Sequence, residues 1–129
     1  MEHVKGTFYL NELLNCRYRY KFLKEIHKGE GIVLSLNKEG FIFLAKEFLS
    51  PKKIMEVMID KPLGPLTVKV EVDSCKMEWY ITDKKKELYF TTQVMFKDLS
   101  YSDKARIIRY ISDCKAERRK ARLRRLKFR

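Results

Sequence analysis

The sequence has 129 residues, with 29 Lys and Arg against 17 Asp and Glu, so its formal net charge is +12. This length suits one domain, and 45% hydrophobic residues with only five Gly and three Pro exclude collagen-like and intrinsically disordered chains. The longest apolar run, at residues 41–45, is far shorter than the roughly 20 residues of a membrane helix. The first residues lack the basic and apolar segments of a signal peptide. We therefore expect a cytoplasmic protein.

The N-terminal part predicts an apolar lead-in followed by a strand. Residues 7–16 are mostly apolar and suggest a short helical turn. Basic and aromatic residues then alternate at residues 17–21, a pattern that predicts a strand with one cationic face and one aromatic face. We expect this strand to continue to Ile26 and to end in a glycine-containing turn at residues 27–31.

The central part predicts several short strands joined by turns, as in an antiparallel barrel or sandwich. Alternation places Val68, Val70 and Val72 on the buried face of one strand. A turn with easily adopted positive φ is expected before Gly40. The prolines of residues 60–65 exclude that segment from a central strand. The predicted strands are residues 31–36, 41–45, 54–59, 66–73, 77–81 and 88–96, with Trp79 near the core.

The C-terminal part predicts a helix. Ser100 and Ser102 are suitable N-caps. The spacing of apolar residues then changes from every second residue to the spacing of a helix. Ile107, Ile111 and Cys114 form one apolar stripe, which Ile108 widens. The stripe thins beyond Cys114, so we expect the helix to dock through about three turns and then to project or fray.

The positive charge is concentrated at the C-terminus, where residues 115–129 contain nine cations and one acid and contribute +8. Such a tail suits an acidic partner, which includes nucleic acid, anionic lipid headgroups and an acidic protein surface. The alternative is a solvated helix end whose cations complement the helix dipole. The residues predicted to contact a partner are Arg118, Arg119, Lys120, Arg122, Arg124 and Arg125.

Cysteine and histidine point to neither catalysis nor a metal site. Cys16, Cys75 and Cys114 are dispersed without a CxxC pair, as is usual for core thiols in a reducing compartment. The two histidines, His3 and His27, have no zinc-chelating spacing. Paired carboxylates, a base beside a nucleophile and a Gly-rich phosphate loop are also absent from the sequence. We therefore expect neither an enzyme nor a cofactor or metal.

Between residues 17 and 112 the sequence resembles the PilZ domain family of bacterial cyclic di-GMP signalling. That family has an RxxxR stretch, a strand ending in [D/N]xSxxG, a strand with Trp, a final strand with Leu-Ser, and a C-terminal helix. Here the same order is Arg17-x-x-x-Lys21, Ser35-x-Asn37-x-x-Gly40, Trp79, residues 93–100 and the helix. The resemblance implies a six-stranded antiparallel β-barrel with a C-terminal α-helix. It divides the chain into a lead-in (1–16), a PilZ-like domain (17–112) and a basic helical tail (113–129).

The resemblance also implies a regulatory ligand, cyclic di-GMP, whose guanine edges and phosphates the family's arginines hold. The corresponding residues are Arg17, Arg19, Lys21, Ser35, Asn37 and Gly40. Lys21 replaces an Arg that could donate two parallel hydrogen bonds to guanine, and Ser35 and Asn37 exchange the residue types of the family motif. The sequence thus predicts a PilZ-type receptor or adaptor with weak or lost nucleotide binding.

Two other functions remain open from the residues. One is a ligand-independent module that contacts a protein partner or docks its basic tail on an acidic surface. The other is a small RNA-binding protein, which the interleaved basic and aromatic residues and the tail favour. The sequence contains no RNP, KH or zinc-knuckle motif to support the RNA-binding alternative.

Overall fold

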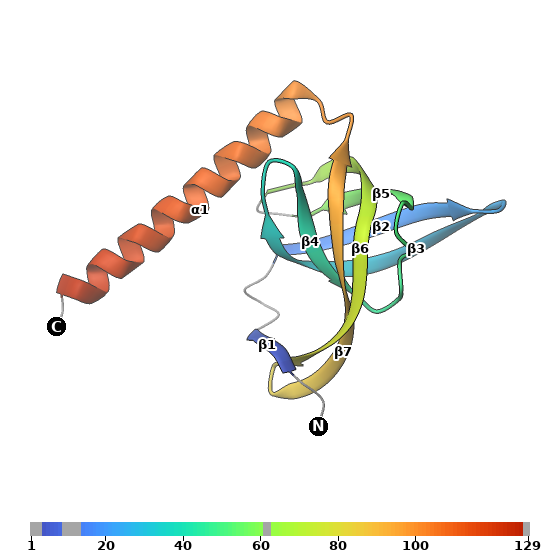
Figure 1. The fold of residues 1–129 in the computed structure, drawn as a ribbon. Coiled ribbons are helices and arrows are strands. Elements are labelled where there is room, and N and C mark those ends of the chain that lie inside the picture. Colours follow the sequence, from blue (N-terminus) through green and yellow to red (C-terminus); the bar gives the residue numbers. More distant parts are fainter. Residues whose placement is uncertain (1–3, 9–13, 61–62, 128–129) are drawn as a thin grey trace.

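The computed structural model describes residues 4–8, 14–60 and 63–127, with side chains described for residues 4–6, 14–60 and 63–114. The chain forms seven strands followed by one long helix (Figure 1). The elements are β1 (Val4–Phe8), β2 (Leu14–Phe22), β3 (Glu25–Leu36), β4 (Gly40–Ala45), β5 (Ile54–Ile59), β6 (Leu66–Thr82), β7 (Lys85–Lys97) and α1 (Tyr101–Lys127).

Six of the strands close into an antiparallel barrel. The sheet order is β6-β5-β2-β3-β4-β7, and β7 pairs back with β6, which closes the barrel. The extra strand β1 pairs in parallel with the far end of β6. Closure leaves the six barrel strands without an unpaired edge along the lengths that pair. The predicted six-stranded barrel with a C-terminal helix is confirmed.

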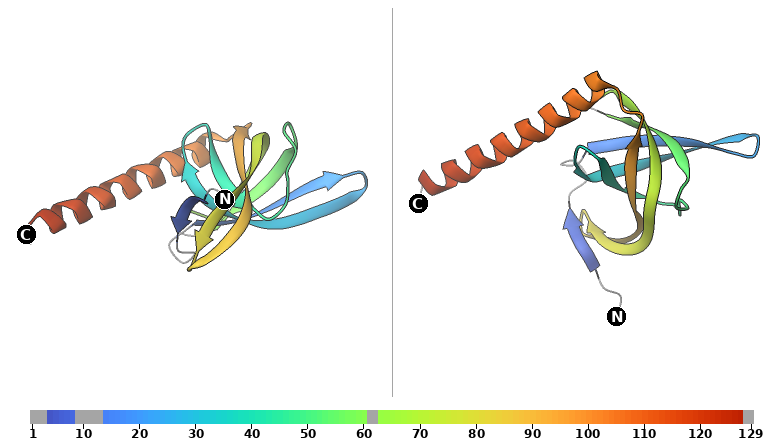
Figure 2. Two further views of the ribbon diagram at one scale, coloured as in Figure 1. Left: turned by 60° about the horizontal axis from the view of Figure 1, so that its bottom comes forward. Right: turned by 45° about the horizontal axis from the view of Figure 1, so that its top comes forward.

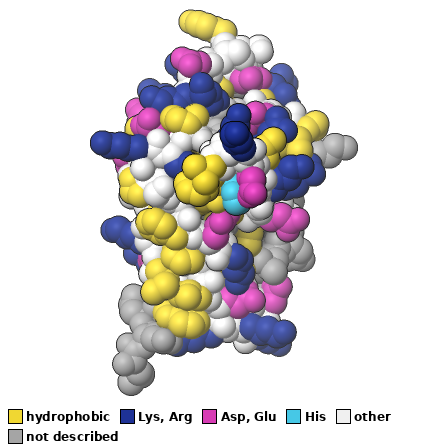
Figure 3. All heavy atoms as spheres, turned by 90° about the vertical axis from the view of Figure 1, so that its right-hand side faces the viewer, with side chains coloured by type: hydrophobic (Ala, Val, Ile, Leu, Met, Phe, Trp, Pro, Cys, Tyr) yellow, Lys and Arg dark blue, Asp and Glu magenta, His cyan; other side chains and the backbone are white. Residues whose placement is uncertain are grey.

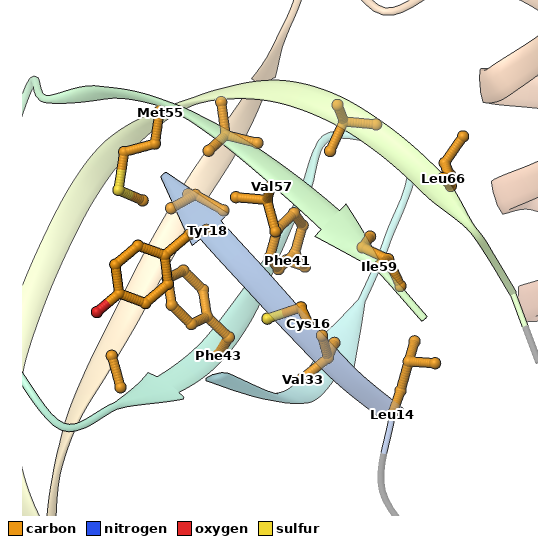
Figure 4. Packing of buried hydrophobic residues seen from close by; sticks show 14 of the residues in the cluster. Leu14, Cys16, Tyr18, Val33, Phe41, Phe43, Met55, Val57, Ile59 and Leu66 are labelled. Carbon is orange, nitrogen blue, oxygen red and sulfur yellow. The ribbon is translucent and has the colours of Figure 1, made fainter. Parts of the chain in front are cut away.

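The barrel interior is filled by one cluster of buried side chains (Figure 4). Val68, Val70 and Val72 are at most 3% exposed, as their alternation with polar neighbours predicts. Phe41 and Phe43 contact each other with ring centroids 5.7 Å apart and lie against residues from β2 and β5. Each buried side chain of this size contributes about 1.5–3 kcal/mol, so this cluster supplies most of the driving force for folding.

Two hairpins extend beyond the barrel (Figure 2). β6 and β7 are 17 and 13 residues long, and their far ends curl away together with β1. A second small cluster, formed by Leu44, Tyr80 and Tyr89 with Ile32 and Leu34, packs apart from the barrel core. The other hairpin is β2–β3, which projects from the side of the barrel opposite to α1 (Figure 1).

The prediction of a turn at residues 27–31 is wrong. The chain reverses at residues 23–24, and residues 27–31 lie inside β3. Gly29 lies opposite Tyr18 in the ladder, and a Cβ at Gly29 would come within 2.8 Å of Tyr18 Cε1. This glycine is therefore needed for the close approach of a buried ring to the backbone, and not for a turn.

Two further local predictions are corrected. Residues 4–8 form strand β1, and β2 already begins at Leu14, so no helical turn is found in the described part of the lead-in, while residues 9–13 lie outside the described residues. Trp79 is only half-buried and belongs to neither buried cluster, because it lies where β6 continues beyond the barrel beside β1. Tyr80 is the buried neighbour instead.

Helix α1 begins as the sequence predicts and docks through its first turns. The backbone N–H of Asp103 donates to Ser100 Oγ at 3.2 Å, which makes Ser100 the N-cap. Ile107 is fully buried, and Tyr110 and Ile111 pack against the barrel core. Ile108 does not widen this stripe, since it is 47% exposed. Beyond this contact the helix leaves the barrel and continues to Lys127 (Figures 1 and 2).

Candidate functional site

Arg17 and Arg19 lie side by side on the outer face of β2, because alternate residues of a strand point to the same face and Cys16 and Tyr18 point inward. They line an open groove of about 520 Å³ between β2, β3 and β5. Lys28 and Glu30 of β3 and Glu56 of β5 lie in the same groove. This is the place where the structure gathers the predicted arginines.

Each arginine of the groove already has an acidic partner. Arg19 Nη2 lies 2.7 Å from Glu56 Oε1, its cross-strand neighbour on β5. Arg17 Nη2 lies 3.5 Å from Asp60 Oδ1 at the end of β5. Both pairs are solvent-exposed, and exposed ion pairs contribute about 0–1 kcal/mol, so a ligand phosphate could displace the carboxylates at small cost. The phosphate would nevertheless have to compete with Asp60 and Glu56 for the two arginines.

The charge of the groove is close to balanced. Three cations (Arg17, Arg19 and Lys28) face two carboxylates (Glu30 and Glu56). A neighbouring hollow of about 550 Å³, which shares Arg17 and Glu30, adds Lys46 and Asp60. Because four cations and three acids line the combined surface, its attraction for a phosphate is much weaker than the number of cations suggests.

The turn between β3 and β4 carries the other predicted motif. Asn37 Oδ1 accepts hydrogen bonds from the backbone N–H groups of Glu39 and Gly40, at 2.8 and 3.0 Å. The backbone N–H of Asn37 donates to the carbonyl of Gly40 at 2.9 Å. The side-chain oxygen of Asn37 thus holds the turn itself, as asparagine commonly does. Ser35 is exposed and follows an irregularity in the β3–β4 ladder.

Gly40 has a different role from the one its motif suggests. The predicted positive φ is wrong, since no described glycine has a positive φ. A Cβ at Gly40 would lie 2.9 Å from the Val94 carbonyl carbon and 3.0 Å from Met95 Cα, with the Val94 oxygen nearer still. Gly40 is therefore required for the close pairing of β4 with β7.

The structure separates the two predicted motifs along the sheet. Leu14 pairs with Val33, so Arg17 lies three positions to one side of this pair and Ser35 two positions to the other. At about 3.3 Å per residue this places Arg17 about 17 Å, and Lys21 about 30 Å, from the level of Ser35. The groove therefore brings together Arg17 and Arg19, whereas Lys21 lies out on the projecting hairpin.

Sequence reasoning missed the acids that face the arginines. Glu56 and Asp60 come from a strand about 40 residues further along the chain, and only the β2–β5 pairing brings them beside Arg19 and Arg17. The alternation of Glu56 with buried Met55 and Val57 was the available signal, since it puts Glu56 on the outer face of its strand.

Two titratable groups beneath the groove are shielded from solvent. Burial, with a contribution from Asp60, raises the pKa of the Cys16 thiol to about 12. Burial also raises the pKa of Tyr18, whose hydroxyl donates to Glu47. The raised pKa values favour the neutral forms of both groups, which lie in the barrel wall beneath the arginines.

The remaining sequence predictions concern metals, membranes and the tail. Among the described residues no group of three or more His, Cys, Asp or Glu side chains could hold a metal ion. No helix in the described part of the chain is long and apolar enough to cross a membrane. The backbone of the tail continues α1, whereas the side chains of Arg118, Arg119, Lys120, Arg122, Arg124 and Arg125 lie outside the described residues.

The closed six-stranded barrel followed by a C-terminal helix has the same fold as solved PilZ domain structures. The chain superposes on the PilZ domain of YcgR from Escherichia coli, in a structure with c-di-GMP, with a TM-score of 0.64 and 16% identity over 87% of this chain and 88% of that one. It also resembles MrkH of K. pneumonia in complex with c-di-GMP (TM-score 0.65, 18% identity, 84% of this chain).

MrkH is described as a c-di-GMP-dependent transcription regulatory factor, and this chain spans about half of its length. Neither protein-family models nor curated protein sequences match the chain. At this level of identity the likeness establishes the PilZ fold.

Proposed function

We propose that the chain is a PilZ-type signalling domain, a receptor or adaptor without catalytic activity, in which recognition of cyclic di-GMP is weak or lost. The observation that carries the proposal is the PilZ fold combined with the paired arginines of the groove, Arg17 with Asp60 and Arg19 with Glu56. The fold supports descent from a nucleotide-binding domain. Because both arginines already pair with carboxylates, these pairs support a reduced affinity for cyclic di-GMP.

Three features lower the expected affinity. Lys21 offers a point charge where a bidentate guanine contact is expected, which costs about 1–3 kcal/mol, or roughly ten- to hundredfold. Asn37 uses its side-chain oxygen within its own turn. Lys21 also lies about 30 Å along the sheet from Ser35, farther than Arg17 and Arg19. The proposed ligand residues remain Arg17, Arg19, Lys21, Ser35, Asn37 and Gly40, and the two arginines would dominate any residual binding.

Calorimetric titration with cyclic di-GMP tests this proposal. The wild type should bind weakly or not at all, and the triple variant Lys21→Arg, Ser35→Asp, Asn37→Ser should gain little, because its changed residues lie at separate places. Tight binding by the wild type that Arg17→Ala abolishes would show a functional sensor and refute the proposed loss. Tight binding that Arg17→Ala leaves unchanged would place the site elsewhere. Restored binding in the triple variant would show that the substitutions, and not their separation, limit affinity.

The long helix favours a second candidate function, an interaction module that docks its basic tail on an acidic protein surface. Only the first turns of the described part of α1 pack on the barrel, and the helix backbone continues to Lys127 away from it. Eight of the nine cations of residues 115–129 thus belong to this projecting part of α1, which the structure describes as far as Lys127.

Poly-L-glutamate serves as a probe of the tail. The full chain should bind it with a steep dependence on salt, because exposed charges are screened within about 10 Å at 0.1 M salt. Replacing Arg118, Arg119, Lys120, Arg122, Arg124 and Arg125 with Gln should abolish this binding while the melting temperature stays unchanged. Binding that survives these six substitutions would exclude the tail as the docking element.

A further inference from the structure

The β2–β3 hairpin projects from the barrel as a two-stranded ribbon. β5 supports β2 only along residues 16–19, whereas the β2–β3 ladder continues to the pair Phe22 and Glu25. The views in Figures 1 and 2 agree that this ribbon reaches well beyond the rest of the barrel. The end of the hairpin can therefore contact another molecule or a membrane without a movement of the barrel.

The end of this ribbon is apolar. Leu23 is 82% exposed, Ile26 is 64% exposed and Phe22 is 56% exposed. Leu23 sits in the turn with a φ of 58°, a left-handed conformation that Gly, Asn or Asp would adopt more readily. A large apolar side chain that is 82% exposed in a turn adds little to the stability of the fold, which points to a role in contacting another surface.

Cations surround this apolar tip. Residues 21–28, at the end of the hairpin, contain three lysines (Lys21, Lys24 and Lys28) against one acid, Glu25. From the β5 side, Lys53 places its Nζ 4.0 Å from the ring centre of Tyr20 and 5.6 Å from that of Phe22. Figure 3, which looks onto this side of the molecule, shows hydrophobic side chains beside the histidine, with both Lys or Arg and acidic side chains around them.

We propose that the tip of the β2–β3 hairpin inserts into the interface of a bilayer that contains anionic lipids. The apolar side chains of Phe22, Leu23 and Ile26 would enter the boundary between headgroups and acyl chains, as the apolar faces of interfacial segments do. The lysines behind them would reach the lipid phosphates, since long Lys side chains keep their ammonium in the polar layer. A narrow projecting tip of this kind suits a soft bilayer better than the flat surface of a protein partner.

Vesicle binding by the full chain tests the insertion. The probe is a vesicle of phosphatidylcholine with about one third phosphatidylglycerol, compared with phosphatidylcholine alone. Replacing two apolar side chains in Leu23→Asn, Ile26→Thr should weaken binding to the anionic vesicles by about ten- to hundredfold. Asn suits the left-handed turn and Thr suits a strand, so the variant should fold. Met77→Thr, at a side chain 63% exposed on β6, is the matched control and should bind like the wild type.

The +8 charge of residues 115–129 would also draw the chain to anionic vesicles, so a readout at the tip itself is required. The variant Phe22→Trp, Trp79→Phe carries one tryptophan, at the tip. Its emission should shift to shorter wavelength and be quenched by brominated lipids when anionic vesicles are added. Binding without a shift or quenching, or equal binding by Leu23→Asn, Ile26→Thr, would overturn the proposal and leave the tip as a contact for a protein.

Discussion

The substitution Gly40→Ala tests whether this glycine is required for the close pairing of β4 with β7 in the barrel wall. Gly40 pairs with Met95 where β4 meets β7, and an added Cβ would lie 2.9 Å from the Val94 carbonyl carbon. Since backbone atoms cannot turn aside as a flexible side chain can, the two strands would have to separate. Overpacking of this kind costs about 3 kcal/mol or more, set against total stabilities of about 5–15 kcal/mol.

For a chain of this length such a loss lowers the melting temperature by about 10–15 °C. Circular dichroism melts and urea unfolding would measure it. Gly6→Ala is the matched control. Among the described residues the nearest neighbour of its added Cβ would be the Tyr80 ring at 3.8 Å, and the fewer conformations of the unfolded chain should leave stability unchanged or slightly raised. If Gly40→Ala melted within about 2 °C of the wild type, the reasoning from the β4–β7 contact would be refuted.

Three further predictions follow from single groups. Leu23→Asn should raise the melting temperature by a few degrees, because Asn tolerates the φ of 58° better than Leu; a lower value would contradict this. Hydrogen bonds from Thr82 and Tyr89 hold the pKa of Glu87 below its ordinary value of 4.5. The ionised carboxylate therefore stabilises the fold above pH 4.5, and this contribution to the free energy of unfolding is lost as the pH falls through the lowered pKa. Glu87→Gln should flatten this acid loss in urea unfolding, and an unchanged slope would argue against it. The Cys16 thiol, with its pKa raised to about 12, should remain unreactive toward a thiol reagent at pH 8 in the native chain, and rapid labelling would show that it is exposed.

Local sequence signals predicted much of the barrel. The alternation at Val68, Val70 and Val72 requires one buried face, and Ser100 marks the start of a helix through its cap. The turn between β2 and β3 was missed because Leu23 and Lys24 are not turn residues, whereas Gly29 a few residues later is. Gly29 is explained only by the Tyr18 ring of the neighbouring strand, a contact that the local pattern does not contain.

The candidate site was harder to predict than the fold. The motif order placed Arg17 and Asn37 in one hypothetical site, but the strand register separates their levels along β2 and β3. The partners of the arginines, Glu56 and Asp60, are distant in sequence and become neighbours only when β5 pairs with β2. The spacing of a motif along the chain thus predicts only which residue types are present. The charge balance of the groove depends on which strands pair in the folded chain.

An NMR titration of the ¹⁵N-labelled wild type with cyclic di-GMP tests the central claim most directly, because it reports affinity and location together. The account predicts a dissociation constant weaker than about 10 µM, with the largest shifts in the groove around Arg17 and Arg19 and at most small ones at the turn of Asn37. Saturable binding tighter than this, with the amides of Arg17, Lys21 and Asn37 shifting along one binding curve, would contradict it.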